Sequence, residues 1–163
     1  MGDRSHDGPG LTVREGRPDD APFVIGLGAK AFDRFGDYGP IMREFLASPD
    51  VRSFIAEEAG ERVGFALVEA PPTDPGFRDL VAIAVDPGHR RSGVGRCLLS
   101  RVIASLEARR EASLLVLTVA DDNDPAITLF RGLGFEMIPG ALGSYAGGQT
   151  SRRMARYVIP RRS

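Results

Sequence analysis

Two short apolar runs and one helical stripe stand out in the pattern of hydrophobic and polar positions. Residues 80–85 and 114–119 are almost continuously apolar, which is typical of strands that are covered on both faces of a sheet. Between them, residues 93–109 carry apolar side chains four positions apart, on one side of a predicted helix: Val94, Leu98, Val102 and Leu106. The order strand, helix, strand predicts a parallel βαβ unit with a right-handed crossover.

Shorter elements surround this unit. Strands are predicted at residues 11–14, 53–57, 63–68, 135–138 and 154–159, and helices at residues 18–31, 40–46 and 123–133. The Gly-rich stretch 140–151 is predicted to be a loop. The predicted fold class is α/β in the broad sense (α+β), with a mixed, mostly antiparallel central sheet of six or seven strands and helices on both faces. We expect residues 1–10 to be a disordered tail and residues 11–163 to be a single domain.

The composition excludes several classes of protein. The 163-residue chain has a formal net charge of −1, so the basic excess of a nucleic-acid-binding protein is absent. No apolar stretch approaches the roughly 20 residues that cross a bilayer, and the polar start lacks the apolar segment of a signal peptide. We therefore expect a cytoplasmic protein with no nucleic-acid or membrane partner. Cys97 is the only cysteine and His6 and His89 are the only histidines, so no metal site is expected.

The junction between the first apolar run and the helix carries the candidate chemistry. Its sequence is Asp86-Pro87-Gly88-His89-Arg90-Arg91-Ser92-Gly93-Val94-Gly95-Arg96. The first N–H groups of a helix have no intrahelical partner, and the helix dipole makes that end electropositive. The glycines at 93 and 95 let a ligand approach the backbone, and the three arginines add positive charge. These features together predict a pyrophosphate site at residues 90–96.

Three phosphate-loop patterns compete for this junction. Gly88 and Gly93 have the spacing of the two glycines of a P-loop, but Val94 stands where that loop needs a lysine. Gly93-Val94-Gly95 supplies two glycines of a dinucleotide-binding loop, but Leu98 stands at the third glycine position. The pattern Arg/Gln-x-x-Gly-x-Gly/Ala after a buried strand matches residues 90–95 in full. A solvated helix start with packing glycines is the alternative.

Two further motifs flank the loop, and together they carry a resemblance. Ile83-Ala84-Val85-Asp86-Pro87 precedes it, and Asn123-x-x-Ala126-x-x-Leu129-Phe130 with Leu133-Gly134-Phe135 follows it. These three pieces, in this order and on the predicted strand, loop and helix, resemble the GNAT N-acetyltransferase superfamily. The resemblance covers roughly residues 11–159 in element order. It implies the acyl-coenzyme A N-acyltransferase fold, in which the two parallel strands splay apart.

The resemblance also implies a site for acetyl-coenzyme A as the donor, with no metal. Backbone groups of Ile83, Ala84 and Val85 would pair with the pantetheine arm as an added strand does. Asn123 would contact the same arm, and Phe130 would lie near the thioester sulfur. The pyrophosphate would be held by the loop residues Arg90, Arg91, Ser92, Gly93, Val94, Gly95 and Arg96.

Two catalytic groups of the family are missing from their usual positions. Many members have a tyrosine, which serves as acid toward the leaving thiolate, where this chain has Phe130. Several have a glutamate, a candidate base, where this chain has Thr118. Neither Phe130 nor Thr118 can move a proton at neutral pH. Tyr145, in the predicted Gly-rich loop, is our candidate for the acid, and a surface tyrosine on a mobile loop is the alternative.

For the acceptor, the family uses the first two helices and their connection as one wall. Here that connection contains Asp33, Asp37 and Tyr38, and two carboxylates with an aromatic ring suit an amine. A solvated turn is the alternative. The sequence therefore predicts an N-acetyltransferase that moves an acetyl group from acetyl-coenzyme A to a primary amine of a small molecule, peptide or protein by direct attack. Phe130 and Thr118 keep open a second function, a catalytically weak or inactive acyl-coenzyme A-binding or regulatory module. Homodimers occur often in the family, so the resemblance also implies a homodimer.

Overall fold

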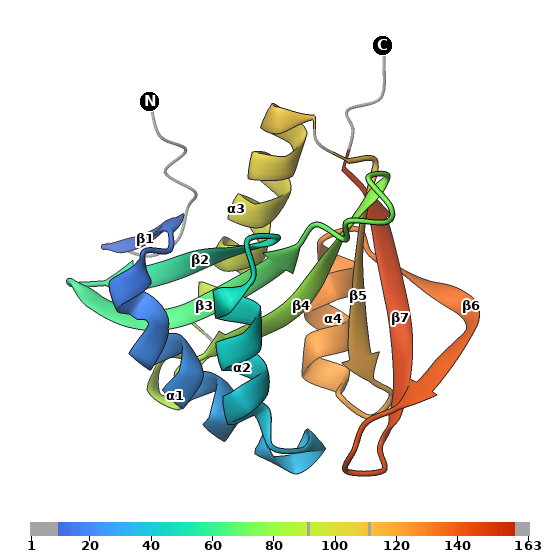
Figure 1. The fold of residues 1–163 in the computed structure, drawn as a ribbon, viewed down its shortest axis with the longest axis horizontal. Coiled ribbons are helices and arrows are strands. Elements are labelled where there is room, and N and C mark those ends of the chain that lie inside the picture. The colour runs from blue at the N-terminus through green and yellow to red at the C-terminus, as the bar shows by residue number, and fades with distance from the viewer. Residues whose placement is uncertain (1–9, 91, 111, 159–163) are drawn as a thin grey trace.

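A single seven-stranded sheet organises the protein, whose computed structural model describes residues 10–90, 92–110 and 112–158. The strand order is β1-β2-β3-β4-β5-β7-β6 (Figure 1). All neighbouring strands are antiparallel except β4 and β5, which are parallel. The predicted mixed, mostly antiparallel sheet is confirmed. Its strands are β1 (Leu11–Glu15), β2 (Val51–Glu58), β3 (Glu61–Glu69), β4 (Phe77–Val85), β5 (Leu114–Ala120), β6 (Glu136–Ser144) and β7 (Thr150–Tyr157).

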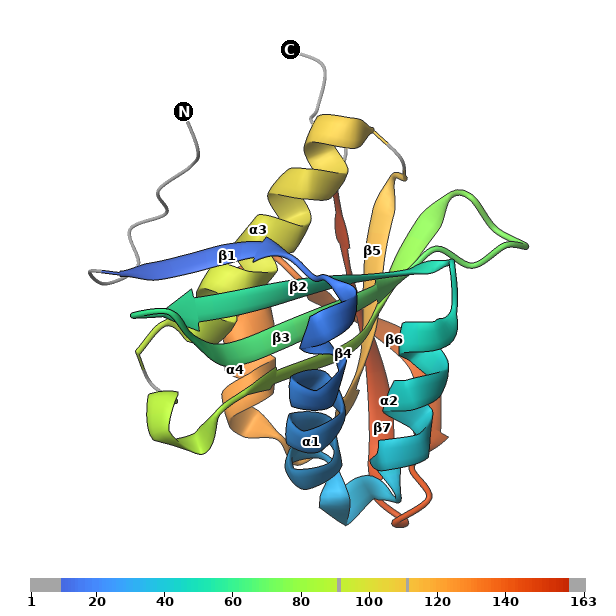
Figure 2. The same ribbon diagram turned by 60° about the vertical axis from the view of Figure 1, so that its left-hand side comes forward.

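Helices cover both faces of this sheet, as the sequence predicts. Helices α1 (Ala21–Ala31) and α2 (Tyr38–Ala47) pack on one face, and α3 (Val94–Arg109) and α4 (Asp124–Gly132) pack on the other (Figure 2). Each pair of helices encloses a separate cluster of apolar side chains between itself and the sheet. No helix of the described ranges is both long enough and apolar enough to cross a membrane. Three short 3-10 turns complete the helical elements: η1 (Pro18–Asp20), η2 (Asp33–Phe35) and η3 (Pro87–His89).

The apolar stripe of α3 explains how this helix holds the centre of the fold. All four of its residues, Val94, Leu98, Val102 and Leu106, are at most 1% exposed. They lie against β3, where Gly64 makes the close approach possible. A Cβ at Gly64 would lie 3.1 Å from side-chain atoms of both Leu98 and Val94. The predicted helix face is therefore confirmed, and a glycine of the opposing strand sets its distance from the sheet.

The parallel strands β4 and β5 pair only at their first halves. Their register runs from Phe77 opposite Leu114 to Leu80 opposite Leu117, and no partner residues follow. Beyond this point β4 stays paired with β3 as far as Val85, and β5 stays paired with β7 as far as Ala120. Because each strand follows its outer neighbour, the two strands diverge (Figure 1). We call this opening the fork. It confirms the splayed βαβ unit that the resemblance implies.

The C-terminal hairpin differs from the sequence prediction. The predicted loop 140–151 is wrong over most of its length, since β6 extends to Ser144 and β7 already begins at Thr150. Gly143, which suggests a loop in the sequence, lies opposite Ser151 in the register. A Cβ at Gly143 would lie 2.9 Å from the Ser151 hydroxyl oxygen, so this glycine permits close strand pairing. What remains between the strands is the short turn 145–149.

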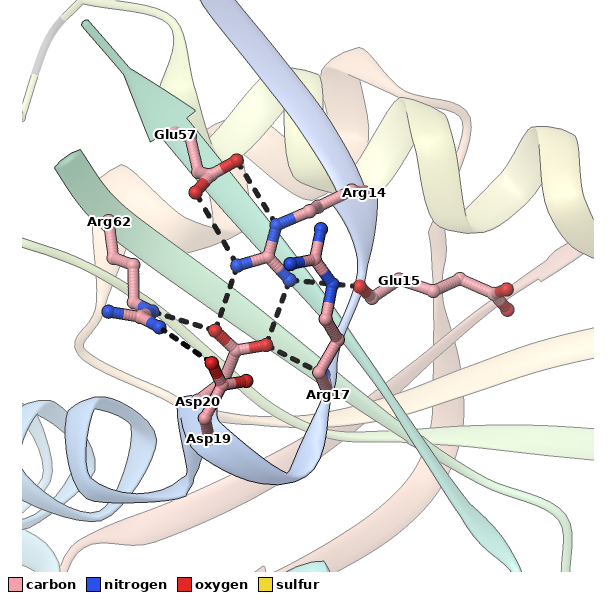
Figure 3. A network of polar contacts seen from close by, with 7 residues as sticks. All are labelled: Arg14, Glu15, Arg17, Asp19, Asp20, Glu57 and Arg62. Atoms are coloured by element: carbon pink, nitrogen blue, oxygen red, sulfur yellow. Dashed lines mark hydrogen bonds and ion pairs between the residues drawn. The ribbon is translucent and has the colours of Figure 1, made fainter. Parts of the chain in front are cut away.

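A buried carboxylate fixes the start of α1 against three strands (Figure 3). The side chain of Asp20 is 2% exposed and accepts hydrogen bonds at 2.8 Å from Arg14 and at 2.7 Å from Arg62. The Arg14 guanidinium also binds Glu57. These hydrogen bonds, that from Arg14 above all, hold the pKa of Asp20 well below its usual range. A carboxyl whose pKa is depressed by folding stabilises the fold above its unfolded pKa of about 3.9, and this stabilisation is lost at lower pH.

Candidate active site

The loop between β4 and α3 brings the helix start next to the fork. Gly93 has a φ of +84°, a left-handed conformation, and lies directly before the first residue of α3. A Cβ at this position would meet no heavy atom within 4 Å, so the backbone of Gly93 faces open space. Gly95 instead packs closely on α4, since its Cβ would lie 3.3 Å from Leu129. The left-handed turn leaves the N–H groups of the first helical turn accessible to an anion.

A cavity of about 710 Å³ lies in front of this helix start. It brings together most of the predicted donor residues. Ser92 is outside its lining and donates its hydroxyl to the carbonyl of His89. Arg91 lies outside the described residues. The predicted residues that do line this cavity are Ile83, Ala84, Val85, Arg90, Gly93, Val94, Gly95, Arg96, Asn123 and Phe130.

The hydrogen-bond pattern of β4 shows which backbone groups face the fork. The N–H of Asp86 donates to the carbonyl of Val63 on β3 at 2.8 Å. Because the backbone groups of an antiparallel strand point alternately to one side and the other, those of Ala84 also point toward β3. The N–H and C=O of Ile83 and Val85 then point into the fork, where β5 gives them no partner residue. Two of the three predicted residues thus present free backbone groups to an extended ligand.

Asn123 directly precedes α4, Phe130 lies on this helix, and both side chains reach the cavities beside the fork. Asn123 is the N-cap of this helix, and its side-chain oxygen accepts a hydrogen bond from the Ala126 N–H at 3.3 Å. Phe130 is 4% exposed, with its ring centroid 5.9 Å from that of Phe135. Both Asn123 and Phe130 line the larger cavity and also a second one. They therefore mark the place where the two cavities adjoin.

The second cavity, of about 110 Å³, lies between the diverging strands. Phe32, Phe35, Tyr38 and Tyr145 form its aromatic side, and Thr118 contributes from β5. The rings make two tilted pairs, Phe32 with Tyr38 at 5.3 Å and Phe35 with Tyr145 at 4.5 Å between centroids. We call this cavity the aromatic chamber. Phe130 lies between this chamber and the cavity at the phosphate loop. An acceptor would therefore meet the thioester from the chamber side.

The turn 145–149 is bound to η2 across the chamber. The Gly147 N–H donates to the Phe35 carbonyl at 3.1 Å, and the Gln149 side-chain nitrogen donates to the Arg34 carbonyl at 2.6 Å. The turn is also closed internally, because the Tyr145 N–H donates to the Gln149 carbonyl at 2.9 Å. Tyr145 therefore lies in a hydrogen-bonded turn, which is shorter than the predicted Gly-rich loop. We call these contacts between η2 and the hairpin the bridge.

Burial changes the acidity of both tyrosines of the chamber. It raises the pKa of Tyr145 to about 12, mainly because its phenol is removed from water. The pKa of Tyr38 is raised for the same reason. Both phenols are consequently protonated at neutral pH and can donate a hydrogen bond. Tyr145 is thus placed and protonated as a donor, and its role in catalysis stays a prediction.

The structure separates the three residues predicted for the acceptor. Tyr38 lines the chamber, whereas Asp33 and Asp37 are exposed and line neither cavity. Asp33 begins η2 and Asp37 follows it, whereas Phe35, between them, is buried with 8% of its surface exposed. Neither carboxylate belongs to the lining of the two cavities, and a role of Asp33 and Asp37 in acceptor binding stays a prediction.

One ionisable residue near the chamber escapes sequence analysis. Asp79 on β4 forms an ion pair with Arg153 on β7 at 3.6 Å, and Arg153 donates to the Thr118 hydroxyl at 3.1 Å. Burial raises the pKa of Asp79, and Arg153 offsets part of this effect. Asp79 was missed because the apolar run starts at Leu80, although β4 already begins at Phe77. An acidic residue directly before a buried run is the signal that could have found it.

The described residues contain no group of three or more histidine, cysteine or acidic side chains that could hold a metal ion.

Comparison with known proteins shows the family. The model of the acetyltransferase (GNAT) family matches residues 22–135, well over half of the chain. The chain belongs to the GNAT acetyltransferase family.

Relatives of this GNAT chain carry names for different acceptors. An N-alpha-acetyltransferase of Sulfurisphaera tokodaii is 32% identical over 124 residues, which cover 69% of this chain and 72% of that protein. A mycothiol acetyltransferase of Amycolatopsis mediterranei is 30% identical over 79% of this chain, which spans only 46% of that protein. The relatives agree on acetyl transfer and differ in the acceptor that their names specify.

Solved structures agree on the fold. The ribosomal-protein-S18-alanine N-acetyltransferase of Escherichia coli matches with a TM-score of 0.76 at 24% identity and covers 94% of this chain and 97% of its own. A putative acetyltransferase of Salmonella typhimurium, solved with its cofactor acetyl-CoA, matches with a TM-score of 0.77 at 20% identity and covers 95% and 98%. The acyl-coenzyme A N-acyltransferase fold is therefore confirmed.

Proposed function

We propose that this protein transfers an acetyl group from acetyl-coenzyme A to a primary amine of a small molecule, peptide or protein by direct attack. The observation that carries this proposal is the junction of two cavities at Phe130. One cavity ends at a helix start suited to phosphates, and the other is the aromatic chamber between the strands. A thioester at the junction would be open to an amine from the chamber side.

The donor would be held mainly by backbone. Its pyrophosphate fits the N-terminus of α3, where the helix dipole favours anions and Arg90 and Arg96 add charge. Its pantetheine arm fits the edge of β4, where Ile83 and Val85 turn their backbone groups into the fork. An arm with amide groups can pair with that edge as an added strand does. Asn123 and Phe130 would flank the arm near its sulfur end.

The reaction needs few side chains. The neutral amine nitrogen attacks the thioester carbonyl carbon, and the oxyanion that forms accepts a hydrogen bond from the Val85 N–H. The carbon–sulfur bond then breaks, the amine loses a proton to water, and the Tyr145 phenol hydrogen-bonds the departing thiolate. Phe130 supplies an apolar contact and no proton. Tyr145, from another part of the fold, takes the place of the tyrosine that many family members have at the position of Phe130.

A coenzyme A-binding module without catalysis is the second candidate, since Phe130 and Thr118 replace the family's acid and base. The two functions are separated by measuring thiol release with acetyl-coenzyme A and a panel of amines, together with calorimetric binding of acetyl-coenzyme A. Thiol release that depends on an amine supports the transferase. Tight binding with no release on any amine would establish the module. The cytoplasmic location and the homodimer stay predictions from the sequence.

A further inference from the structure

The cavity in front of α3 is lined by one side chain whose charge changes near neutral pH. Among the described residues, the ionisable side chains of this lining are Arg34, His89, Arg90 and Arg96. A guanidinium group keeps its charge at every pH of interest, whereas an imidazole ordinarily titrates near pH 6.5. His89 is therefore the residue of the donor cavity through which pH can act on a bound anion.

The short turn η3 holds His89 in place at the edge of this cavity. The His89 N–H donates to the Asp86 carbonyl at 2.9 Å, and the His89 carbonyl accepts a hydrogen bond from the Ser92 hydroxyl. Asp86 is itself fixed to the sheet, because its N–H donates to the Val63 carbonyl at 2.8 Å. Contacts on both sides of His89 therefore tie the residue to the sheet and to the segment that begins α3.

The two nitrogens of the His89 imidazole have different surroundings. Nδ1 is buried and lies 3.6 Å from the Asp86 carboxylate, which is too long for a hydrogen bond and close enough for an ion pair with a protonated ring. The side chain as a whole is 33% exposed, and only its Nδ1 is a buried nitrogen without a hydrogen-bond partner in the described part of the chain. Nε2 is therefore left for a ligand on the cavity side.

The charges around His89 favour a protonated ring once an anion is bound. The Gly88 N–H donates to the Asp86 carboxylate at 2.9 Å and, above all other contacts, holds the pKa of Asp86 below its usual range. This carboxylate is therefore charged wherever an imidazole titrates, and it attracts the imidazolium. The nearby cations repel the imidazolium, and a phosphate bound among them offsets that repulsion. These cations are Lys30 on α1, Arg34 on η2, Arg90 in the loop and Arg96 on α3.

We propose that His89 binds a phosphate group of the coenzyme A donor in its protonated form, so that donor binding takes up a proton and becomes tighter as the pH falls from 8 to 6. A neutral imidazole carries one N–H, whereas the imidazolium carries two. Only the imidazolium can direct Nδ1–H to Asp86 and Nε2–H to a phosphate oxygen at the same time. The inference rests on the donor site of the proposed transferase function.

Calorimetry of donor binding without any amine tests this proposal, because it measures protons as well as affinity. The first probe is dephospho-coenzyme A, which keeps the pyrophosphate and lacks the 3′-phosphate, a group that itself titrates near pH 6. Titrations in buffers of different ionisation enthalpy give the number of protons taken up. A phosphate that favours the imidazolium about tenfold should cause an uptake of about half a proton at pH 7. The Kd should then be about sixfold lower at pH 6 than at pH 8.

Two substitutions separate the charge of His89 from its shape. His89→Gln keeps a hydrogen-bonding side chain without a charge, and it should bind the donor at pH 6 about as weakly as the parent does at pH 8. His89→Lys is charged at both pH values, and it should bind at pH 8 about as tightly as the parent does at pH 6. Neither variant should take up the proton. His6→Gln is the control, because it removes the only other histidine of the chain and should bind like the parent.

The same titrations with coenzyme A identify the phosphate that His89 binds. A difference in proton uptake between the parent and His89→Gln with dephospho-coenzyme A assigns the contact to the pyrophosphate, and a difference only with coenzyme A assigns it to the 3′-phosphate. Both results support the proposal. If neither ligand binds at either pH, the donor site and the proposed function fail together with this inference. If both ligands bind and His89→Gln keeps the proton uptake and the pH dependence of the parent, the transferase function stands and this inference alone is wrong.

Discussion

The donor side and the acceptor side of the proposed site are built in different ways. The donor side consists mainly of the end of β4, the loop that follows it and the starts of α3 and α4, and the edge of β4 offers it backbone groups. The acceptor side consists of side chains from segments far apart in sequence. The bridge between Arg34 and Gln149, for example, joins residues 115 positions apart.

This difference has a physical consequence. A backbone site depends on a strand that ends, a helix that begins and glycines between them, so many sequences with that local order can form it. The aromatic chamber depends on which rings the tertiary fold brings together, and single substitutions alter it. One donor site can therefore serve relatives whose names specify different acceptors. Substitutions on one side should therefore change the use of one substrate and leave the use of the other intact.

Gly93→Glu should abolish the donor site while the fold is kept. The substitution places a carboxylate at the helix start where the phosphates would lie, in a conformation that side chains rarely adopt. We expect the Kd for acetyl-coenzyme A, measured by calorimetry, to rise at least about 100-fold, or about 2.7 kcal/mol.

Gly140→Glu is the matched control for this variant. Gly140 also has a positive φ, +74°, and open space around its Cβ position, but it lies on β6 away from both cavities. It should show the same conformational strain and unchanged binding. A folded Gly93→Glu protein that binds acetyl-coenzyme A like its parent would remove the basis for the donor site.

Tyr145→Phe should slow the reaction without weakening the donor site. The ring keeps its contact with Phe35, but the hydroxyl that would stabilise the leaving thiolate is lost. We expect kcat to fall roughly tenfold to 100-fold with an unchanged KM for acetyl-coenzyme A. Tyr157→Phe is the control, because Tyr157 is 77% exposed and lines neither cavity. Equal kcat values for Tyr145→Phe and the parent would eliminate the proposed role.

Tyr145 also shows where sequence reasoning stops. The βαβ unit, the fork and the phosphate loop follow from local apolar runs and glycines, so the sequence predicts them. The bridge depends on hairpin pairing between β6 and β7, in a stretch where glycines suggest a loop. Asp33 and Asp37 are near Tyr38 in the sequence, yet neither belongs to the lining of the two cavities. Only tertiary contacts decide which side chains enter the chamber.

Gln149→Ala should loosen the bridge and affect only the acceptor. It removes the 2.6 Å hydrogen bond to the Arg34 carbonyl, an interaction of roughly 0.5–1.5 kcal/mol. We expect the KM for the amine to rise about threefold to tenfold while acetyl-coenzyme A binding stays the same. Thr150→Ala, an exposed neighbour on the same hairpin, should change neither value. A weaker donor affinity in Gln149→Ala would show that the two sides are coupled.

Asp79→Asn should change stability and acceptor use in opposite directions. Burial raises the pKa of Asp79 despite Arg153, so the charged carboxylate is less stable in the folded chain than in the unfolded one. A neutral amide should therefore raise the free energy of unfolding near neutral pH by less than about 1 kcal/mol. The gain should shrink as the pH falls below the raised pKa and vanish below the unfolded pKa of about 3.9, where the parent carboxyl is protonated in both the folded and the unfolded state. Denaturant unfolding at both pH values measures this difference.

The same substitution leaves the Arg153 charge without its acidic partner beside Thr118. The chamber wall becomes more positive, so we expect the KM for the amine to rise by a few-fold and the affinity for acetyl-coenzyme A to stay unchanged. A residue that costs stability and supports acceptor use belongs to the site, whereas a purely structural ion pair would lose stability when it is broken. If Asp79→Asn lowers stability and leaves the amine KM unchanged, Asp79 belongs to the scaffold and not to the acceptor side.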